Sequence, residues 1–144
     1  MLTVNSITNG VVIDHIKAGL GYRIYQLLDL AKSPYSVALL MNVSSAKEGK
    51  KDILKIEQAG ELDYSILSLL DPQITINEIK DEQVVNKYKV QLPNEVYDFI
   101  KCKNPRCISN HQNIKQHFHL MNPKTVIYRC HYCDNLYKCG GQEC

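Results

Sequence analysis

The spacing of the cysteines constrains this chain more than any other feature of its sequence. Cys102 and Cys107 are separated by four residues, and Cys130 and Cys133, further along the chain, are separated by two. Two short cysteine pairs at this spacing are typical of a structural zinc site, because each pair lies on a tight turn and four thiolates can surround one tetrahedral ion. We therefore predict one structural Zn²⁺ per chain, held by Cys102, Cys107, Cys130 and Cys133.

Two further cysteines leave alternatives to this ligand set. Cys139 and Cys144 form another pair with four residues between them, so three pairs compete for one four-ligand site. We favour the first two pairs because the intervening segment 108–129 can form a hairpin. A set of disulfide bonds is the other alternative. The N-terminal residues have neither a basic start nor a long apolar run, so we expect a cytoplasmic protein without a secretory signal, and a reducing cytoplasm favours metal.

Four histidines lie in or beside the same stretch of the chain. His131 stands between two predicted ligands and is an alternative ligand itself, while His111, His117 and His119 lie in the loop between the cysteine pairs. We expect all four to be surface residues or to contact the ligands from outside, because four cysteines already complete a structural zinc site. Such a site has no open position, so it is structural and not catalytic.

The composition allows one domain or two small ones. The 144 residues carry a formal net charge of +2, and the two sides of Pro93 differ only mildly: residues 1–93 have ten basic against eleven acidic residues, and residues 94–144 have seven against four. This charge does not indicate a nucleic-acid-binding arm. No apolar run is long enough to predict a membrane span. The last fifty residues or so are too few for a large core, so a metal would have to stabilise them.

Hydrophobic periodicity predicts an α+β fold in the N-terminal part. Helical spacing predicts helices over residues 19–32 and 62–70, and short apolar or alternating runs predict strands over residues 2–7, 11–16, 35–43, 52–58, 73–79 and 84–90. This order matches a ferredoxin-like antiparallel α/β sandwich with both helices on one face. We expect it to occupy residues 1–93 and to be followed by a small all-β zinc-binding domain over residues 94–144.

A second group of polar residues lies near the ends of these predicted strands, and an antiparallel sheet could gather them on one patch. The group comprises Asp14, His15, Lys51, Lys55, Asn77 and Lys87. Lysines bind phosphates, and a carboxylate can accept a hydrogen bond from a ribose hydroxyl, so a nucleotide site is one interpretation. A solvated sheet face is the other. The chain has neither a P-loop nor a dinucleotide-binding glycine motif.

Four segments together resemble the regulatory chain of aspartate carbamoyltransferase, over essentially the whole sequence. They are residues 10–16 (GVVIDHI), 49–57 (GKKDILKIE), 72–77 (PQITIN) and the four-cysteine motif. The resemblance implies a non-catalytic subunit of pyrimidine biosynthesis, with an allosteric domain followed by a zinc domain. It also implies a homodimer of regulatory chains, docking of the zinc domains on catalytic chains, inhibition by CTP with UTP assisting, and activation by ATP.

The resemblance also assigns candidate nucleotide contacts. Asp14 and Lys55 match positions at the ribose, and His15, Lys51 and Lys87 match positions near the phosphates. The positions around the base match Val4, Ser6, Ile7, Asn77, Glu82 and Val84. Two of them depart from well-known members, which have an aromatic residue in place of Glu82 and a smaller apolar residue in place of Ser6. The base preference therefore depends on whether these positions contact the base through the backbone.

Two other classes of function remain as alternatives. A zinc-ribbon nucleic-acid-binding protein would need a basic face with aromatic platforms. The C-terminal part has aromatic residues that include Phe118, Tyr128, Tyr132 and Tyr137 but little positive charge, so we expect no nucleic-acid partner and no membrane. A small enzyme using Asp14 and His15 as acid and base would need a nucleophile or an open metal site, and the sequence offers neither.

Overall fold

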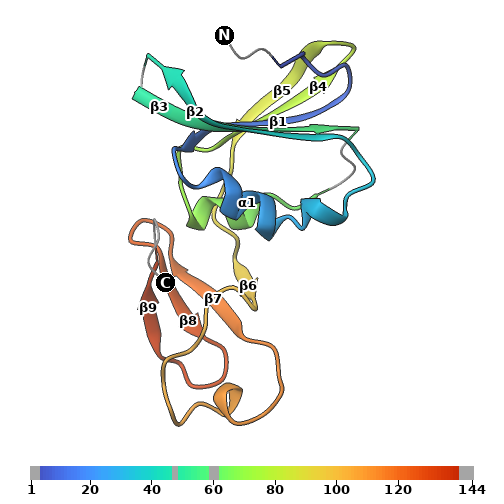
Figure 1. Cartoon of the computed structure of the whole chain (residues 1–144). Helices are drawn as coiled ribbons and strands as arrows, with labels where there is room; N and C mark the ends of the chain where they lie inside the picture. The colour runs from blue at the N-terminus through green and yellow to red at the C-terminus, as the bar shows by residue number, and fades with distance from the viewer. Residues whose placement is uncertain (1–3, 47–48, 59–61, 140–144) are drawn as a thin grey trace.

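The protein forms a larger α+β unit and a smaller all-β unit, each built on its own antiparallel sheet (Figure 1). The computed structural model describes residues 4–46, 49–58 and 62–139. The five-stranded sheet ends at Lys89 and the four-stranded sheet begins at Glu95, so the predicted linker around Pro93 lies between the two sheets.

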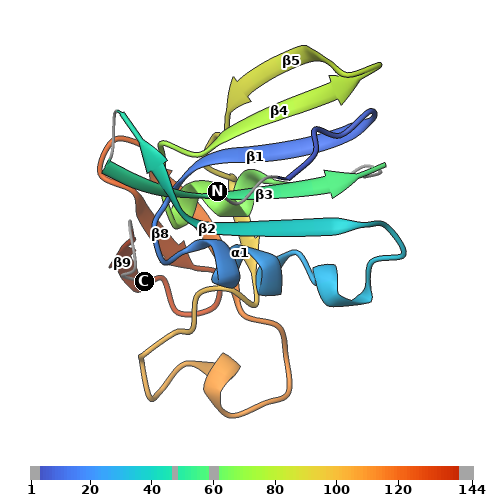
Figure 2. The same cartoon turned by 45° about the horizontal axis from the view of Figure 1, so that its top comes forward.

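The larger sheet has the ferredoxin-like strand order that the sequence predicts. Its strands are β1 (Gly10–Lys17), β2 (Val37–Ser45), β3 (Gly49–Glu57), β4 (Thr75–Lys80) and β5 (Gln83–Lys89), in the order β2-β3-β1-β4-β5 with every neighbour antiparallel (Figure 2). The first four form the β4-β1-β3-β2 sheet of that fold, and β5 extends its edge beside β4. The predicted α+β class is confirmed.

The helices are shorter than the periodicity predicts. The segment predicted as one helix over residues 19–32 forms α1 (Gly21–Leu27) and a 3₁₀ turn, η1 (Leu30–Lys32). Asp29 separates them because its backbone is left-handed, with φ of 53°, a conformation that cannot continue a right-handed helix. The second predicted helix is a 3₁₀ helix, η2 (Ser65–Leu69), and residues 59–61 before it are not among those described.

The predicted strand over residues 2–7 is also wrong for the residues that the structure describes, since residues 4–7 are in no strand and residues 2 and 3 lie outside the described range. The two residues that follow, Thr8 and Asn9, form backbone hydrogen bonds with distant segments of the chain. Thr8 accepts a hydrogen bond from the N–H of Glu82 at 2.9 Å, and Asn9 accepts one from the N–H of Gln58 at 2.8 Å. The segment therefore crosses the hairpin ends of the sheet without adding a strand.

One face of the large sheet is covered by α1 and the 3₁₀ helices, and a buried aspartate fixes α1 to it. Asp52 on β3 is fully buried, and its carboxylate accepts hydrogen bonds from the backbone N–H groups of Gly19 at 3.0 Å, Gly21 at 2.9 Å and Asn42 at 3.0 Å. Gly21 must be glycine, because a Cβ there would lie 2.8 Å from the Asp52 carboxylate. The helix start, β2 and β3 are thus joined through one side chain.

The small unit confirms the hairpin that the sequence predicts between the cysteine pairs. Its strands are β6 (Glu95–Tyr97), β7 (His117–Asn122), β8 (Ile127–Cys130) and β9 (Leu136–Lys138), in sequential order, with a 3₁₀ turn, η3 (Ile108–Asn110), before β7. Phe118 and Tyr128 fill its core and are fully buried. The Tyr128 hydroxyl donates to the carbonyl of Pro93 at 2.7 Å, which ties the connecting segment to the small core.

The two units share apolar side chains where they meet. Leu69 of η2 is buried in the core of the small unit, and Ile66 and Phe99 pack against both cores. The guanidinium of Arg23 on α1 lies 5.8 Å from the centre of the Phe99 ring. Figure 1 shows α1 and the green η2 between the large sheet and the small unit. The helix layer therefore connects the large sheet to the small unit.

Candidate functional site

The four predicted cysteines converge on one point in the small unit. All four are free thiols, and their sulfur atoms lie within 4.8 Å of one another. The Sγ atoms of Cys102 and Cys133 are 3.6 Å apart, and those of Cys107 and Cys130 are 3.7 Å apart. Sulfurs bound tetrahedrally at the usual zinc–thiolate length would be about 3.8 Å apart. The four side chains therefore fit a tetrahedral metal ion.

Tight turns and neighbouring hydroxyls hold these sulfurs in place. The N–H of Cys107 donates to the carbonyl of Asn104 at 3.0 Å, closing the turn of the first pair. The Tyr137 hydroxyl lies 3.3 Å from the sulfur of Cys102, and the Ser109 hydroxyl lies 3.0 Å from the sulfur of Cys107. Such outer partners orient metal ligands and stabilise the charge of a thiolate.

The protonation of the thiols also favours a cation at this point. Burial raises the pKa of Cys130 to about 12. Burial acts in the same direction on Cys133, but hydrogen bonds from the side chain of Asn104 and the backbone of Asn135 bring its pKa down to about 7. A buried thiol with a high pKa becomes a thiolate when a metal binds and displaces its proton. A metal ion would thus convert these thiols to thiolates, and its positive charge would stabilise them.

Cys139 and the histidines of the small unit do not belong to this four-thiol centre. Cys139 is buried in the small core but does not belong to the cluster of four sulfurs, and Cys144 lies outside the described residues. His131, the alternative ligand, is exposed and gathers with His117 and His119 in a second group. His111 directs its Nε2 to the carbonyl of Pro105.

On the large sheet, three predicted nucleotide contacts lie in one row. Lys55, Val12, Asn77 and Lys87 are successive partners across β3, β1, β4 and β5. Direct partners in antiparallel strands point to the same side of the sheet. The row faces away from the helices, because the alternate residue Leu54 is buried beneath them. Among the described residues, Lys55 and Lys87 have no ion-pair partner, so this face presents two free ammonium groups.

Asp14 and His15 lie at an irregularity of β1 on the same sheet. The register of β1 against β3 shifts between Ile13 and Ile16, and His15 has a left-handed backbone with φ of 57°. The Asp14 carboxylate pairs with the ammonium of Lys51 at 3.0 Å, and His15 Nδ1 lies 3.2 Å from the Thr75 hydroxyl. The bulge thus places a carboxylate, an ammonium and an imidazole beside the row, further along β1 and β3 from Val12 and Lys55.

The N-terminal segment closes a pocket over one end of this face. The pocket has a volume of about 320 Å³ and is lined by residues 4–8, residues 36–38 at the start of β2, Lys55 and Glu57. It therefore brings together Val4, Ser6, Ile7 and Lys55 among the predicted contacts. Glu82 contacts this segment through its backbone N–H, and Val84 is exposed on β5; neither lines the pocket.

A larger pocket, of about 660 Å³, opens elsewhere on the large unit between Gly10, Tyr64 and Tyr88. It contains none of the predicted contacts, and its basic residue is Lys80. A triphosphate needs several cations or backbone donors, so the chemistry favours the face with Lys51, Lys55 and Lys87.

The chain matches known proteins over almost its whole length. Residues 2–91 match the family model described as aspartate carbamoyltransferase regulatory chain, allosteric domain, and residues 94–139 match the model for the metal binding domain of the same chain. The chain belongs to the family of aspartate carbamoyltransferase regulatory chains. Regulatory chains of Clostridium botulinum and Clostridium tetani are each 50% identical to it over 141 and 140 residues, covering 97% and 96% of this chain and 97% of each relative. One from Methanococcus aeolicus is 43% identical over 137 residues, 94% of this chain and 88% of the relative.

As a regulatory chain, the protein carries the four-thiol centre in its metal-binding part and the lysine row in its allosteric part. No helix among the described residues is long and apolar enough to cross a membrane. Sequence reasoning missed the residues that support the sites, such as Asp52, Ser109 and Tyr137. In the sequence, only their positions point to these roles. Asp52 falls on the buried side of the β3 alternation, and Ser109 follows a ligand by two residues.

Proposed function

We propose that this chain is a non-catalytic subunit that binds nucleotides on the helix-free face of its large sheet and transmits their effect to catalytic chains of aspartate carbamoyltransferase. CTP inhibits, with UTP assisting, and ATP activates, so that pyrimidine biosynthesis responds to nucleotide supply. The protein acts in the cytoplasm as a regulatory-chain homodimer. The observation that carries the proposal is the row of Lys55, Asn77 and Lys87 beside a pocket.

The nucleotide occupies the row and the pocket together. Lys55 lies in both, which suits a residue at the ribose, and Asp14 lies two residues along β1 from Val12, the partner of Lys55. His15, Lys51 and Lys87 take the phosphates. The base lies against Val4, Ser6, Ile7, Asn77, Glu82 and Val84. Because Glu82 meets the N-terminal segment through its backbone N–H, the loss of an aromatic side chain at this position leaves that contact intact.

The metal is a structural Zn²⁺, one per chain, on Cys102, Cys107, Cys130 and Cys133. Four thiolates fill a tetrahedral zinc ion, which leaves no position for substrate. The metal-binding domain, residues 94–144, docks on the catalytic chain, and the allosteric domain, residues 1–93, pairs with its counterpart in the dimer. A nucleotide changes the distant active site only if it binds two states of the assembly with different affinity.

The shared apolar junction supplies the route between the domains. A shift of the sheet moves α1 and η2, and these elements contact the small core through Arg23, Ile66, Leu69 and Phe99. The connecting segment is itself held by the hydrogen bond from Tyr128 to Pro93. Packed side chains with two arrangements carry such coupling, which is typically about 1–3 kcal/mol.

Lys55→Ala is expected to weaken nucleotide binding by about ten-fold to a hundred-fold, because a charge-assisted hydrogen bond contributes about 1.5–3 kcal/mol. Calorimetric titration of CTP and ATP into the wild-type chain and the variant measures this. Assembly with catalytic chains should persist, since the metal-binding domain is unchanged.

Lys50→Ala is the matched control for this experiment. Lys50 is an exposed lysine of the same strand, but the alternation of β3 directs it to the opposite side of the sheet from Lys55. Its replacement should change nucleotide affinity by no more than about 0.5 kcal/mol. Equal affinities in wild type and Lys55→Ala would remove Lys55 from the site, and the regulatory role would then rest on family membership alone.

A further inference from the structure

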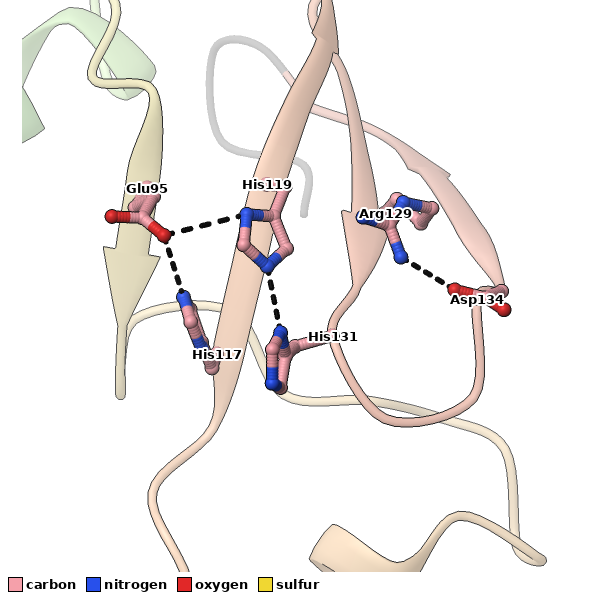
Figure 3. Close-up of polar contacts among 6 residues, drawn as sticks. All are labelled: Glu95, His117, His119, Arg129, His131 and Asp134. Atoms are coloured by element: carbon pink, nitrogen blue, oxygen red, sulfur yellow. Dashed lines mark hydrogen bonds and ion pairs between the residues drawn. The ribbon is translucent and has the colours of Figure 1, made fainter.

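Three histidines of the small unit form a cluster that takes no part in the four-thiol centre. His117 and His119 lie on β7, and His131 lies in the turn between two of the cysteine ligands. One ring nitrogen of each lies within 4.8 Å of the others, and His119 Nε2 is 2.8 Å from His131 Nδ1 (Figure 3). Two imidazole nitrogens on one zinc-like ion are separated by about 2.9–3.4 Å, depending on geometry. The His119 and His131 nitrogens are thus already at about the separation that a shared ion requires.

A carboxylate on the neighbouring strand orients two of these rings. Glu95 of β6 is the direct partner of His119 in the sheet. Its Oε1 lies 3.2 Å from His117 Nε2 and 3.4 Å from His119 Nδ1, as Figure 3 shows. When His117 Nε2 carries its proton, the carboxylate accepts that N–H and leaves His117 Nδ1 with a lone pair, and the same oxygen lies beside His119 Nδ1. Carboxylates hold metal-binding histidines in this manner.

The cluster is ordered by packing and open to solvent. The rings of His117 and His131 stack with their centres 4.3 Å apart. The ring of Tyr97 also stacks on that of His117, with a distance of 4.3 Å between the two centres. Phe118, between the two β7 histidines, is buried in the small core, so both histidines project from the outer side of the strand. His131 is exposed, which gives an ion a way in.

Burial and neighbouring charges also favour a neutral ring at His119. Burial lowers the pKa of His119, and the neighbouring His117 and Arg129 act in the same direction. Arg129 itself turns to Asp134 (Figure 3), so its guanidinium does not occupy the cluster. Neutral imidazole is the form that donates a lone pair to a metal.

We propose that this cluster is a second metal site, which binds one divalent transition-metal ion of the Zn²⁺, Ni²⁺ or Cu²⁺ class through His117, His119 and His131, with Glu95 orienting the first two. Imidazole ligands select such ions over Mg²⁺ and Ca²⁺, which require oxygen. Three protein ligands leave a coordination position for water or for a group of another molecule. Bound metal would join β6, β7 and the cysteine turn across the surface of the small unit.

The test is a titration of the full-length, zinc-loaded chain with Ni²⁺ alone, followed by calorimetry and by metal analysis after desalting. The wild-type chain should bind one Ni²⁺ beyond its structural zinc. His119→Gln and His131→Gln should each lose that ion, and Glu95→Gln should weaken its binding by about ten-fold to a hundred-fold. His111→Gln is the matched control, because His111 belongs to the same unit but not to the cluster, and it should bind Ni²⁺ like the wild type.

Retention of the structural zinc shows that each variant is folded. A second readout needs no variant: paramagnetic Ni²⁺ should broaden the ring-proton resonances of His117, His119 and His131 while leaving those of His15 and His111 sharp. A wild-type chain that binds no second ion would overturn the proposal. So would Ni²⁺ that persists in both histidine variants or broadens His15 and His111 equally. This experiment does not measure the response to nucleotides. A failure of the proposal for the histidine cluster would therefore not bear on the regulatory role.

Discussion

Cys130→Ser is expected to remove the structural metal and to abolish docking on the catalytic chains. Cys130 is fully buried, and its sulfur lies 3.7 Å from that of Cys107. A serine hydroxyl does not replace a thiolate, so the remaining three cysteines would hold zinc incompletely. Structural zinc contributes about 10–16 kcal/mol of binding free energy to folding. The small unit, with a core centred on Phe118 and Tyr128, has too little apolar burial to replace it.

Metal content and co-elution with catalytic chains measure both effects, after dialysis against a weak chelator that empties the histidine cluster. Cys144→Ser is the control, since Cys144 is outside the predicted ligand set, and it should keep one zinc per chain and assemble normally. Equal losses in the two variants would mean that the C-terminal cysteine pair contributes to the site. One tightly held zinc in Cys130→Ser would contradict the ligand assignment.

Leu69→Ala is expected to weaken the transmission of the nucleotide signal as well as the fold. Leu69 belongs to η2 of the allosteric part but is buried in the core of the metal-binding part. Truncation of a buried leucine costs about 2–5 kcal/mol of stability. Because the side chain joins the two cores, its loss should also reduce the coupling between nucleotide and active site by about 0.5–2 kcal/mol. Nucleotide affinity of the isolated chain should change little.

Leu67→Ala provides the comparison that separates stability from transmission. Leu67 lies on the same helix and is fully buried, but in the core of the large unit. Its truncation should lower the free energy of unfolding by a similar amount and leave the coupling near that of the wild type. Chemical denaturation and nucleotide-dependent turnover of the reconstituted assembly give the two quantities. A similar loss of coupling in both variants would assign the effect to stability alone.

The sequence predicted the features that depend on local chemistry. Four cysteines at fixed spacing specify a metal centre wherever the chain places it, and the alternating run over residues 52–58 correctly predicted a strand, which is part of β3. The order of the segments was enough for the ferredoxin-like sheet, because few topologies connect them without crossing.

The features that the sequence could not predict depend on contacts between distant residues. From sequence alone, an aspartate such as Asp52 is expected at the surface. In the structure its carboxylate is buried and accepts hydrogen bonds from three backbone N–H groups of two other segments. The left-handed Asp29 interrupts a helix that the apolar spacing would have continued. His117 and His119 are close in sequence, but only the pairing of β6, β7 and β8 brings His131 to them and places Glu95 against His117 and His119.

The most direct measurement of the regulatory role is the turnover of catalytic chains reconstituted with this chain, recorded with and without CTP, UTP and ATP. We predict that CTP, assisted by UTP, lowers the rate and ATP raises it. After a mercurial displaces the zinc, the released catalytic chains should keep their turnover and lose every nucleotide response. An assembled complex whose rate ignores all three nucleotides would contradict the account, as would loss of turnover together with the metal.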